Sequence, residues 1–312
     1  MRILRLIGDN LALLTGLGAI IAFVHPPIFL IFKDVFLWMF AATMFALGTV
    51  LDTNDLKITL KQPGKIAAGL MTQYTIMPLL GFTAAWFADL PPDIAIGLII
   101  VACAPGAMAS NVIVYLAGGA LAFSIALTTV ATFLSPIVTP SLVQWLGGAF
   151  LPIEFWPMMK TILQTVLVPL LFGIGLKALL KDKIAPVAKA APAIAVLAIV
   201  IICSYAVAAN QTRIVELGPS LLLIVITINA FGYIIGWQLA KLYGFDHRHK
   251  VALSIEIGMQ NAGLGVALAL KHFSPEAALP GAIFAVWCIL TAAGMTAFLR
   301  KRSAVKEFSG FD

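Results

Sequence analysis

The sequence predicts an all-α polytopic membrane protein with ten transmembrane helices. Of its 312 residues, 61% are hydrophobic and only 11% are charged, whereas a soluble protein of this length needs a far more charged surface. The apolar runs are continuous rather than alternating, which argues against a transmembrane β-barrel. Because a spanning helix needs about 20 apolar residues, the length accommodates about ten spans joined by short loops.

The ten expected spans follow the apolar runs in order. The first run contains Asp9 and is not followed by a convincing cleavage site, so we expect a first span rather than a signal peptide. The expected spans are residues 8–26, 35–51, 66–88, 94–117, 120–146, 157–180, 188–208, 217–242, 250–270 and 277–299.

The distribution of basic residues predicts the orientation. An even number of spans places both termini on the same side of the membrane. If that side is cytoplasmic, all of the 20 Lys and Arg residues except Lys33, Lys160, Arg213 and Lys271 fall in cytoplasmic segments. This agrees with the positive-inside rule. We therefore expect a multi-pass protein of the cell (inner) membrane with cytoplasmic N- and C-termini, embedded in the lipid bilayer.

The chain divides into two halves of five spans, residues 1–153 and 154–312. Because five is odd, two homologous halves would form inverted repeats, an arrangement typical of secondary transporters. The fourth span of each half contains a short polar interruption with glycine, CAPGAMASN (Cys103–Asn111) in one and EIGMQNAG (Glu256–Gly263) in the other. Paired interruptions of this kind indicate a substrate site near the middle of the membrane.

Glu256 is the acidic residue that lies well inside a span, and no Lys or Arg of that span lies close to it. A carboxylate near the bilayer centre costs at least about 2.5–3.5 kcal/mol, and a bound cation would offset that cost. Pro105 and Gly106 predict local unwinding, which frees carbonyl oxygens for a cation and a helix N-terminus for an anion. A structural or proton-carrying glutamate and a simple packing kink remain the alternatives.

Other polar side chains lie in the neighbouring spans. Ser124, Thr128 and Thr132 are spaced by four residues and therefore share one helical face. Gln73 precedes Pro78, which predicts a further break, and Asn229 occupies the equivalent place in the second half. The hydroxyl groups could instead bond to their own helix backbone, and Asn229 could link two helices.

The sequence does not predict an enzyme. It contains no H-E-x-x-H, G-x-S-x-G or Walker motif, and its four histidines fall in expected loops or at span ends. The net charge of +6 arises from residues between spans. We therefore expect no nucleic-acid partner.

The motifs of five spans resemble those of the bile acid:sodium symporter family, including its bacterial members. They are TQYTIMPLL in span three, APGAMASN in span four, LSPIVTP in span five, EIGMQNAGL in span nine and GAIFAVW in span ten. The resemblance covers nearly the whole chain. It implies a panel domain of spans 1, 2, 6 and 7 and a core domain of spans 3–5 and 8–10, in which broken spans four and nine cross.

The resemblance also implies two sodium sites that share one carboxylate. The first would consist of Ser110, Asn111, Ser124, Thr128 and Glu256. The second would consist of Gln73, Glu256 and Gln260 together with the backbone carbonyls of Ile257 and Met259. All of these ligand atoms are oxygens, as a hard cation requires.

The residues expected to face the substrate depart from those of bile-acid-binding bacterial members. Those members carry a His-Asn pair after the span-ten tryptophan and a threonine at the position of Met108, whereas here Trp287 precedes Cys288. The expected substrate contacts are Met108, Ala109, Asn261, Trp287 and Cys288. We expect a monomeric sodium-coupled symporter of a small organic anion, such as a pantoate- or pyruvate-like carboxylate, rather than of a bile acid. A proton-coupled carrier and a ligand receptor that does not transport are the alternatives.

Overall fold

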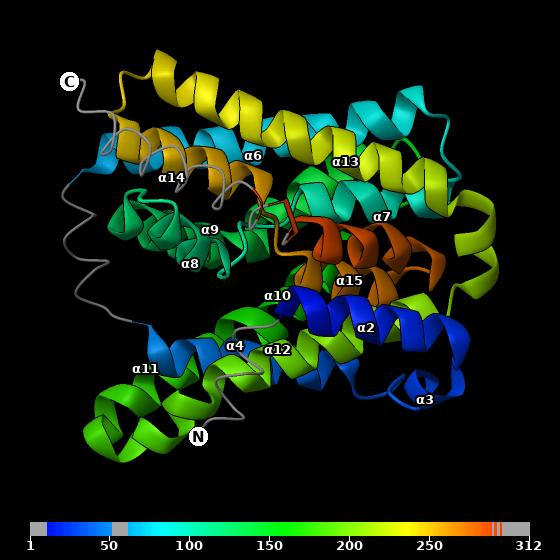
Figure 1. Cartoon of the computed structure of the whole chain (residues 1–312), viewed down its shortest axis with the longest axis horizontal. Coiled ribbons are helices and arrows are strands. Elements are labelled where there is room, and N and C mark those ends of the chain that lie inside the picture. Colours follow the sequence, from blue (N-terminus) through cyan, green and yellow to red (C-terminus); the bar gives the residue numbers. More distant parts are fainter. Residues whose placement is uncertain (1–10, 52–61, 289, 292–293, 295–312) are drawn as a thin grey trace, which may run out of the picture.

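The computed structural model describes residues 11–51, 62–288, 290–291 and 294. Within these residues the fold is helical, and no strand longer than an isolated bridge occurs (Figure 1). The helices of the first half are α2 (Leu11–Val24), α3 (Pro27–Leu30), α4 (Phe36–Val50), α6 (Pro63–Phe87), α7 (Pro92–Ala102), α8 (Ser110–Leu116), α9 (Leu121–Leu142) and η1 (Val143–Gly147). Those of the second half are α10 (Phe155–Ile162), η2 (Leu163–Leu167), α11 (Val168–Leu180), η3 (Lys181–Ile184), α12 (Ala185–Ala208), α13 (Gln211–Leu242), α14 (His247–Gly258), α15 (Ala262–His272) and η4 (Glu276–Ala278).

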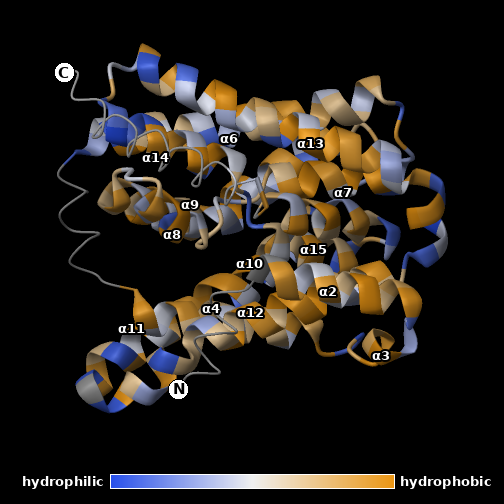
Figure 2. Cartoon of the chain, in the orientation of Figure 1, coloured by the Kyte–Doolittle hydropathy of each residue, from blue (hydrophilic) through white to orange (hydrophobic). Residues whose placement is uncertain are grey.

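The helices follow the expected spans and confirm an all-α membrane protein. Four of them, Leu121–Gly147, Phe155–Leu180, Ala185–Ala208 and Gln211–Leu242, are long and apolar enough to cross a membrane. Shorter apolar helices cover Leu13–Val24, Phe36–Val50, Pro92–Ala102 and Glu276–Cys288. Apolar residues run along the helices while hydrophilic residues gather towards their ends (Figure 2). Ten crossings and the inverted repeats stay predictions, and the last part of the tenth expected span lies outside the described residues.

The helices form two groups that pack mainly within themselves (Figure 1). In the flanking group (α2, α4, α11 and α12), α12 packs against α2 and α4, and α4 packs against α11. In the crossover group (α6–α9 and α13–α15), α13 packs against α6 and α14, and α7 packs against α6 and α15. α10 contacts α9 and α15 of the crossover group and continues into η2, which contacts α4 and α11 of the flanking group. These groups correspond to the expected panel and core domains, a division that stays a prediction.

Two helices of the crossover group are interrupted where the sequence analysis expects it. The first interruption separates α7, which ends at Ala102, from α8, and the second separates α14, which ends at Gly258, from α15. The two extended segments run antiparallel past each other and form a bridge between Gly106 and Gln260. By contrast, α6 continues from Pro63 to Phe87 with Pro78 inside it. The break expected at Pro78 is therefore wrong, because neighbouring helices can accommodate a proline inside a membrane helix.

α14, which carries Glu256, begins with a capped turn. The Asp246 carboxylate accepts hydrogen bonds from the backbone N–H of His249 at 3.1 Å and contacts its ring nitrogen Nδ1 at 2.6 Å. The backbone hydrogen bond holds the pKa of Asp246 below its usual value. Such a cap fixes the start of the helix by satisfying one of its free N–H groups.

A close helix contact lies between α4 and α11. A Cβ atom on Gly173 would lie 2.3 Å from the Phe45 carbonyl oxygen, and one on Gly48 would lie 2.3 Å from the Leu170 carbonyl oxygen. Both distances are far below van der Waals contact with backbone atoms that cannot move independently. Small residues at this crossing let the two backbones touch, as is common in membrane helices.

This contact predicts that Gly173→Ala destabilises the protein by about 1–3 kcal/mol, because the added methyl group must separate α4 from α11. Gly175→Ala in the same helix is the matched control, since nothing lies within 4 Å of a Cβ there. It should leave stability unchanged or raise it by less than about 1 kcal/mol. Thermal unfolding of the two variants in detergent measures the difference. Equal melting temperatures would contradict the close packing of this crossing.

Candidate functional site

The candidate site is built around the carboxylate of Glu256, which lies near the end of α14. Glu256 is buried, with 1% of its surface exposed. Its Oε1 atom accepts hydrogen bonds from the hydroxyl groups of Ser110 and Ser124. Its Oε2 atom accepts one from Thr128 at 2.6 Å. Ser110 begins α8 directly after the first interruption, and the other two hydroxyl groups project from one face of α9. The consecutive helices α8 and α9 therefore meet the carboxylate of a helix that lies far from them in the sequence.

Gly106 makes room for this carboxylate. A Cβ atom at this position would lie 2.7 Å from Glu256 Oε2. The two interruptions hold each other in place, because the Ala107 N–H donates to the Met259 carbonyl and the Asn261 N–H donates to the Pro105 carbonyl, both at 2.9 Å. The crossing backbone thus helps to fix the position of Glu256.

Around Glu256, the number of oxygen–oxygen contacts at hydrogen-bonding distance exceeds the number of hydroxyl protons available to fill them. Ser110, Ser124 and Thr128 supply three hydroxyl protons. Besides their contacts with Glu256, Ser124 Oγ lies 2.8 Å from Asn111 Oδ1, and Thr128 Oγ1 lies 2.9 Å from the Ser124 carbonyl oxygen. Three protons cannot satisfy these five contacts at once. An oxygen cluster with one negative charge and too few protons suits a hard monovalent cation.

A second group of oxygen atoms lies beside the crossing. Gln73 Nε2 donates to Gln260 Oε1 at 2.8 Å and to the Ala104 carbonyl at 3.3 Å. Gln260 Nε2 in turn donates to the Ile257 carbonyl at 2.8 Å. The amide oxygen Gln73 Oε1 is buried, and no described residue donates a hydrogen bond to it. A buried acceptor without a donor is unfavourable unless a cation or water reaches it.

The described residues contain no group of three or more His, Cys, Asp and Glu side chains able to hold a metal ion. The oxygen atoms near the crossing come instead from hydroxyl, amide and carbonyl groups around a single carboxylate. Such a set does not match the nitrogen and sulfur ligands of zinc or copper. It fits a weakly held hard cation.

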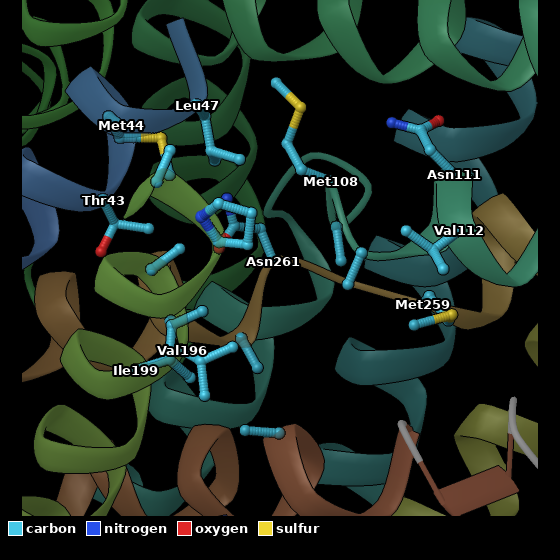
Figure 3. Close-up of a pocket in the computed structure, with 18 of the residues that line it drawn as sticks. Thr43, Met44, Leu47, Met108, Asn111, Val112, Val196, Ile199, Met259 and Asn261 are labelled. Carbon is cyan, nitrogen blue, oxygen red and sulfur yellow. The ribbon is translucent and has the colours of Figure 1, made fainter. Parts of the chain in front are cut away.

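A cavity of about 440 Å³ adjoins the crossing, between the flanking group and the crossover group (Figure 3). Met108, Ala109, Asn261 and Cys288, four of the five residues expected to contact the substrate, line it. The fifth, Trp287, does not line it, and its buried Nε1 atom has no hydrogen-bond partner among the described residues. Three of the expected sodium ligands, Asn111, Met259 and Gln260, also reach this cavity.

The two walls of the cavity differ in chemistry. The wall formed by α4 and α12 is apolar, with Phe40, Met44, Leu47, Val196 and Ile199 among its residues. Thr43 belongs to this wall, but its hydroxyl group donates to the Met39 carbonyl at 3.1 Å and points away from the neighbouring side chains in Figure 3. The opposite wall supplies the amide groups of Asn111, Gln260 and Asn261. Among the described residues, those that line the cavity include no Lys, Arg or His.

Asn261 links the cavity to α15. Its side-chain oxygen accepts a hydrogen bond from the Leu264 N–H at 3.1 Å and so caps the helix. The partial positive charge of this 11-residue helix therefore lies next to the cavity. This end of α15 can attract an anion without a basic side chain.

Two features of the site have no clear signal in the sequence. The apolar wall of α4 and α12 consists of ordinary apolar residues in apolar runs, so nothing in the sequence distinguishes it from a lipid-facing surface. The Ala104 and Gly258 carbonyls accept hydrogen bonds from Gln73 and Asn229, and of these groups only the side-chain amides stand out in the sequence.

Thr132, the third hydroxyl residue on the face of α9, donates to the Thr128 carbonyl at 2.8 Å. This is the alternative that the sequence analysis left open, a hydroxyl group bonded to its own helix backbone.

Comparison with known proteins gives concordant results. The family model described as "Sodium Bile acid symporter family" matches residues 37–217, more than half of the chain. An "Uncharacterized sodium-dependent transporter YocS" of Bacillus subtilis (strain 168) is 37% identical over 93% of this chain and 90% of that protein. The "Probable sodium/metabolite cotransporter BASS1, chloroplastic" is 35% identical in Arabidopsis thaliana, over 85% of this chain and 66% of that protein. The protein of the same name in Oryza sativa subsp. japonica is 37% identical, over 78% of this chain and 60% of that protein.

The chain thus spans nearly the whole of its bacterial relative and less than two thirds of these two chloroplast relatives. The family model covers the first interruption and the hydroxyl face of α9. The match to the bacterial relative covers 289 residues and is therefore not confined to one half. The chain belongs to the sodium bile acid symporter family.

Proposed function

We propose that this membrane protein is a sodium-coupled symporter of a small organic anion and works by alternating access. The observation that carries the proposal is the buried Glu256 carboxylate, surrounded at the helix crossing by more oxygen acceptors than protons. The names of the relatives, a sodium-dependent transporter and sodium/metabolite cotransporters, support sodium as the coupling ion and a small metabolite as the substrate. They also identify a transporter rather than an enzyme.

Two sodium ions would share Glu256. The first would bind among Ser110, Asn111, Ser124, Thr128 and Glu256, whose side-chain oxygens are already within hydrogen-bonding distance of one another. The second would bind among Gln73, Glu256, Ile257, Met259 and Gln260. The Gln73 Oε1 atom, which has no hydrogen-bond donor among the described residues, supports the second site, because a cation there would satisfy it.

The charge of the site favours a substrate with one negative charge. Two sodium ions and one carboxylate leave a net charge of one positive unit beside the cavity. The part of the lining that the structure describes supplies no basic side chain to neutralise a second negative charge on the substrate. The Asn261 amide and the N-terminus of α15 would hold the carboxylate of the substrate, and its apolar part would contact the wall of α4 and α12. A small monocarboxylate, pantoate- or pyruvate-like, satisfies both requirements, and a bile-acid-like anion is the alternative.

The position of the cavity supports an inward-facing state. It extends to Leu51 at the end of α4 and to Ala191 and Pro192 near the start of α12, which is the expected cytoplasmic side. At the opposite end the two parts of the molecule touch. His272 Nε2 lies 2.9 Å from Thr161 Oγ1, and the Gln211 side chain donates to the Phe23 carbonyl. Opening to the outside would have to break these contacts.

The proposal predicts that sodium stabilises the purified protein and that Glu256→Gln abolishes this effect, because the substitution removes the carboxylate charge that both sodium ions would share. At a sodium concentration a hundred times the Kd, binding adds about 2.7 kcal/mol to the free energy of unfolding. The measurement is thermal unfolding in sodium chloride and in choline chloride at equal ionic strength.

Glu216→Gln is the matched control for the charge change. Glu216 lies on the exposed surface of α13 and pairs with Arg213 at 3.1 Å, so its replacement should leave the sodium response intact. Equal stabilisation by choline and sodium would contradict sodium binding. A response to pH in place of sodium would support a proton-coupled carrier with Glu256 as the titrating group.

The proposal also predicts that Asn261→Asp removes anion binding but leaves sodium binding in place. Aspartate caps a helix as well as asparagine does, so α15 keeps its start while the cavity gains a charge that repels a carboxylate. We expect pantoate or pyruvate to raise the melting temperature of the unmodified protein only in sodium, and not at all in this variant. Asn261→Ser, which keeps a cap without the charge, should retain part of the response.

Uptake into proteoliposomes separates transport from binding. An inward sodium gradient should drive uptake of any anion found in the thermal screen. Binding without uptake would favour a receptor. An anion whose stabilising effect is the same in sodium and in choline would contradict the coupling, because coupling between two ligands is reciprocal.

A further inference from the structure

Asn229 of α13 takes the place at the second interruption that Gln73 of α6 takes at the first. Gln73 Nε2 donates to the Ala104 carbonyl at 3.3 Å, and Asn229 Nδ2 donates to the Gly258 carbonyl at 2.8 Å. Each carbonyl belongs to the residue two positions before the bridge between Gly106 and Gln260. The two amides therefore satisfy equivalent backbone carbonyls at the ends of α7 and α14.

The two amide oxygens differ in their partners. Gln73 Oε1 receives no hydrogen bond from the described residues. Asn229 Oδ1 lies 2.9 Å from the Thr291 hydroxyl group, which can donate to it and which also lies 3.0 Å from the Trp287 carbonyl oxygen and 3.2 Å from the Cys288 carbonyl oxygen. Asn229 is 1% exposed, and its two amide contacts agree with one orientation, with Nδ2 towards the Gly258 carbonyl and Oδ1 towards the Thr291 hydroxyl group. One amide oxygen remains available for a cation, and the other is occupied by a protein donor.

The Gly258 carbonyl lies at a sensitive place. Gly258 lies between Ile257 and Met259, and the carbonyls of these two neighbours are proposed to bind the second sodium ion. It also lies two residues after Glu256. The backbone here has little freedom. A Cβ atom on Gly258 would lie 2.5 Å from the Tyr233 ring, and one on Gly232 would lie 3.3 Å from the Gly258 Cα atom. A hydrogen bond to this carbonyl therefore orients the Gly258–Met259 peptide group and limits how far the neighbouring peptide groups can rotate.

We propose that Asn229, oriented by Thr291, is a positioning residue for the second sodium site. It holds the end of α14 so that the Ile257 and Met259 carbonyls point at the ion, and it does not bind the ion itself. This inference rests on the proposed sodium symport. Gln73 and Asn229, the two buried amides at equivalent positions, then have different roles. Gln73 binds the ion, and Asn229 positions the backbone carbonyls that bind it.

The test compares Asn229→Leu with the unmodified protein in two measurements. One is the sodium concentration at half-maximal thermal stabilisation, and the other is the melting temperature without sodium. Loss of a group that orients a metal ligand weakens metal binding by about tenfold or more, so the half-maximal concentration should rise by at least that factor. Thr291→Val removes only the hydroxyl group and keeps the branched shape. It should raise the half-maximal concentration by about fivefold, and it decides the question if Asn229→Leu does not fold.

Asn210→Leu is the matched control. Asn210 is also buried and donates to two carbonyls, those of Ala206 at 2.6 Å and Pro275 at 2.7 Å, but it lies away from the crossing. Its replacement should lower the melting temperature without changing the half-maximal sodium concentration. The double variant of Asn229 and Thr291 should bind sodium no more weakly than Asn229→Leu, because Thr291 acts through Asn229.

The outcomes are distinct. A lower melting temperature with an unchanged half-maximal sodium concentration, in either the Asn229 or the Thr291 variant, would reduce Asn229 to a structural residue and overturn the inference. Absence of any sodium effect on the unmodified protein would overturn the proposed function itself. A sodium effect lost in Glu256→Gln but unchanged in Asn229→Leu and Thr291→Val would leave sodium binding intact and reject only the positioning role.

Discussion

The two hydrogen bonds between the crossing segments are the interactions on which the rest of the site depends. Unwound backbone at membrane depth is stable only when its polar groups find partners within the protein. Here the Ala107 N–H donates to the Met259 carbonyl and the Asn261 N–H to the Pro105 carbonyl. Each interruption satisfies the other, so neither would be stable alone. The same crossing brings Glu256 within reach of Ser110, 146 positions earlier in the chain.

A single carboxylate among neutral oxygens explains how the ions and the anion would depend on one another. Buried charges interact strongly because little water screens them. A charged Glu256 with no bound cation would be a buried unpaired carboxylate, which is unfavourable in free energy. Two sodium ions with no anion would leave an uncompensated positive charge. Each ligand therefore improves the electrostatic environment of the others. Coupling then follows from charge balance, and a long-range structural signal is not needed to produce it.

The sequence predicts the polar half of the site well, because polar residues are rare in apolar spans and so stand out. Both interruptions and the hydroxyl groups that contact Glu256 were expected, and the structure brings those hydroxyl groups to the carboxylate. The apolar half could not be predicted. Phe40 and Ile199 face the cavity, but in an apolar run such residues could equally face lipid. Pro78 shows that a conspicuous residue can also mislead. A proline in a membrane helix breaks it only if the neighbouring helices do not accommodate it, and here α6 continues through Pro78.

The division of residues between the two helix groups has a mechanical consequence. All of the proposed sodium ligands belong to α6, α8, α9, α14 or the crossing segments, so the crossover group could carry both ions without help from α4 or α12. The cavity, in contrast, is lined by both groups. In the proposed mechanism, a bound anion would therefore be the ligand that touches both groups. If the two groups move as units, bound sodium would order the polar wall formed by the crossover group. The contact between the substrate and the apolar wall of α4 and α12 would then decide whether the protein with all its ligands bound can change conformation.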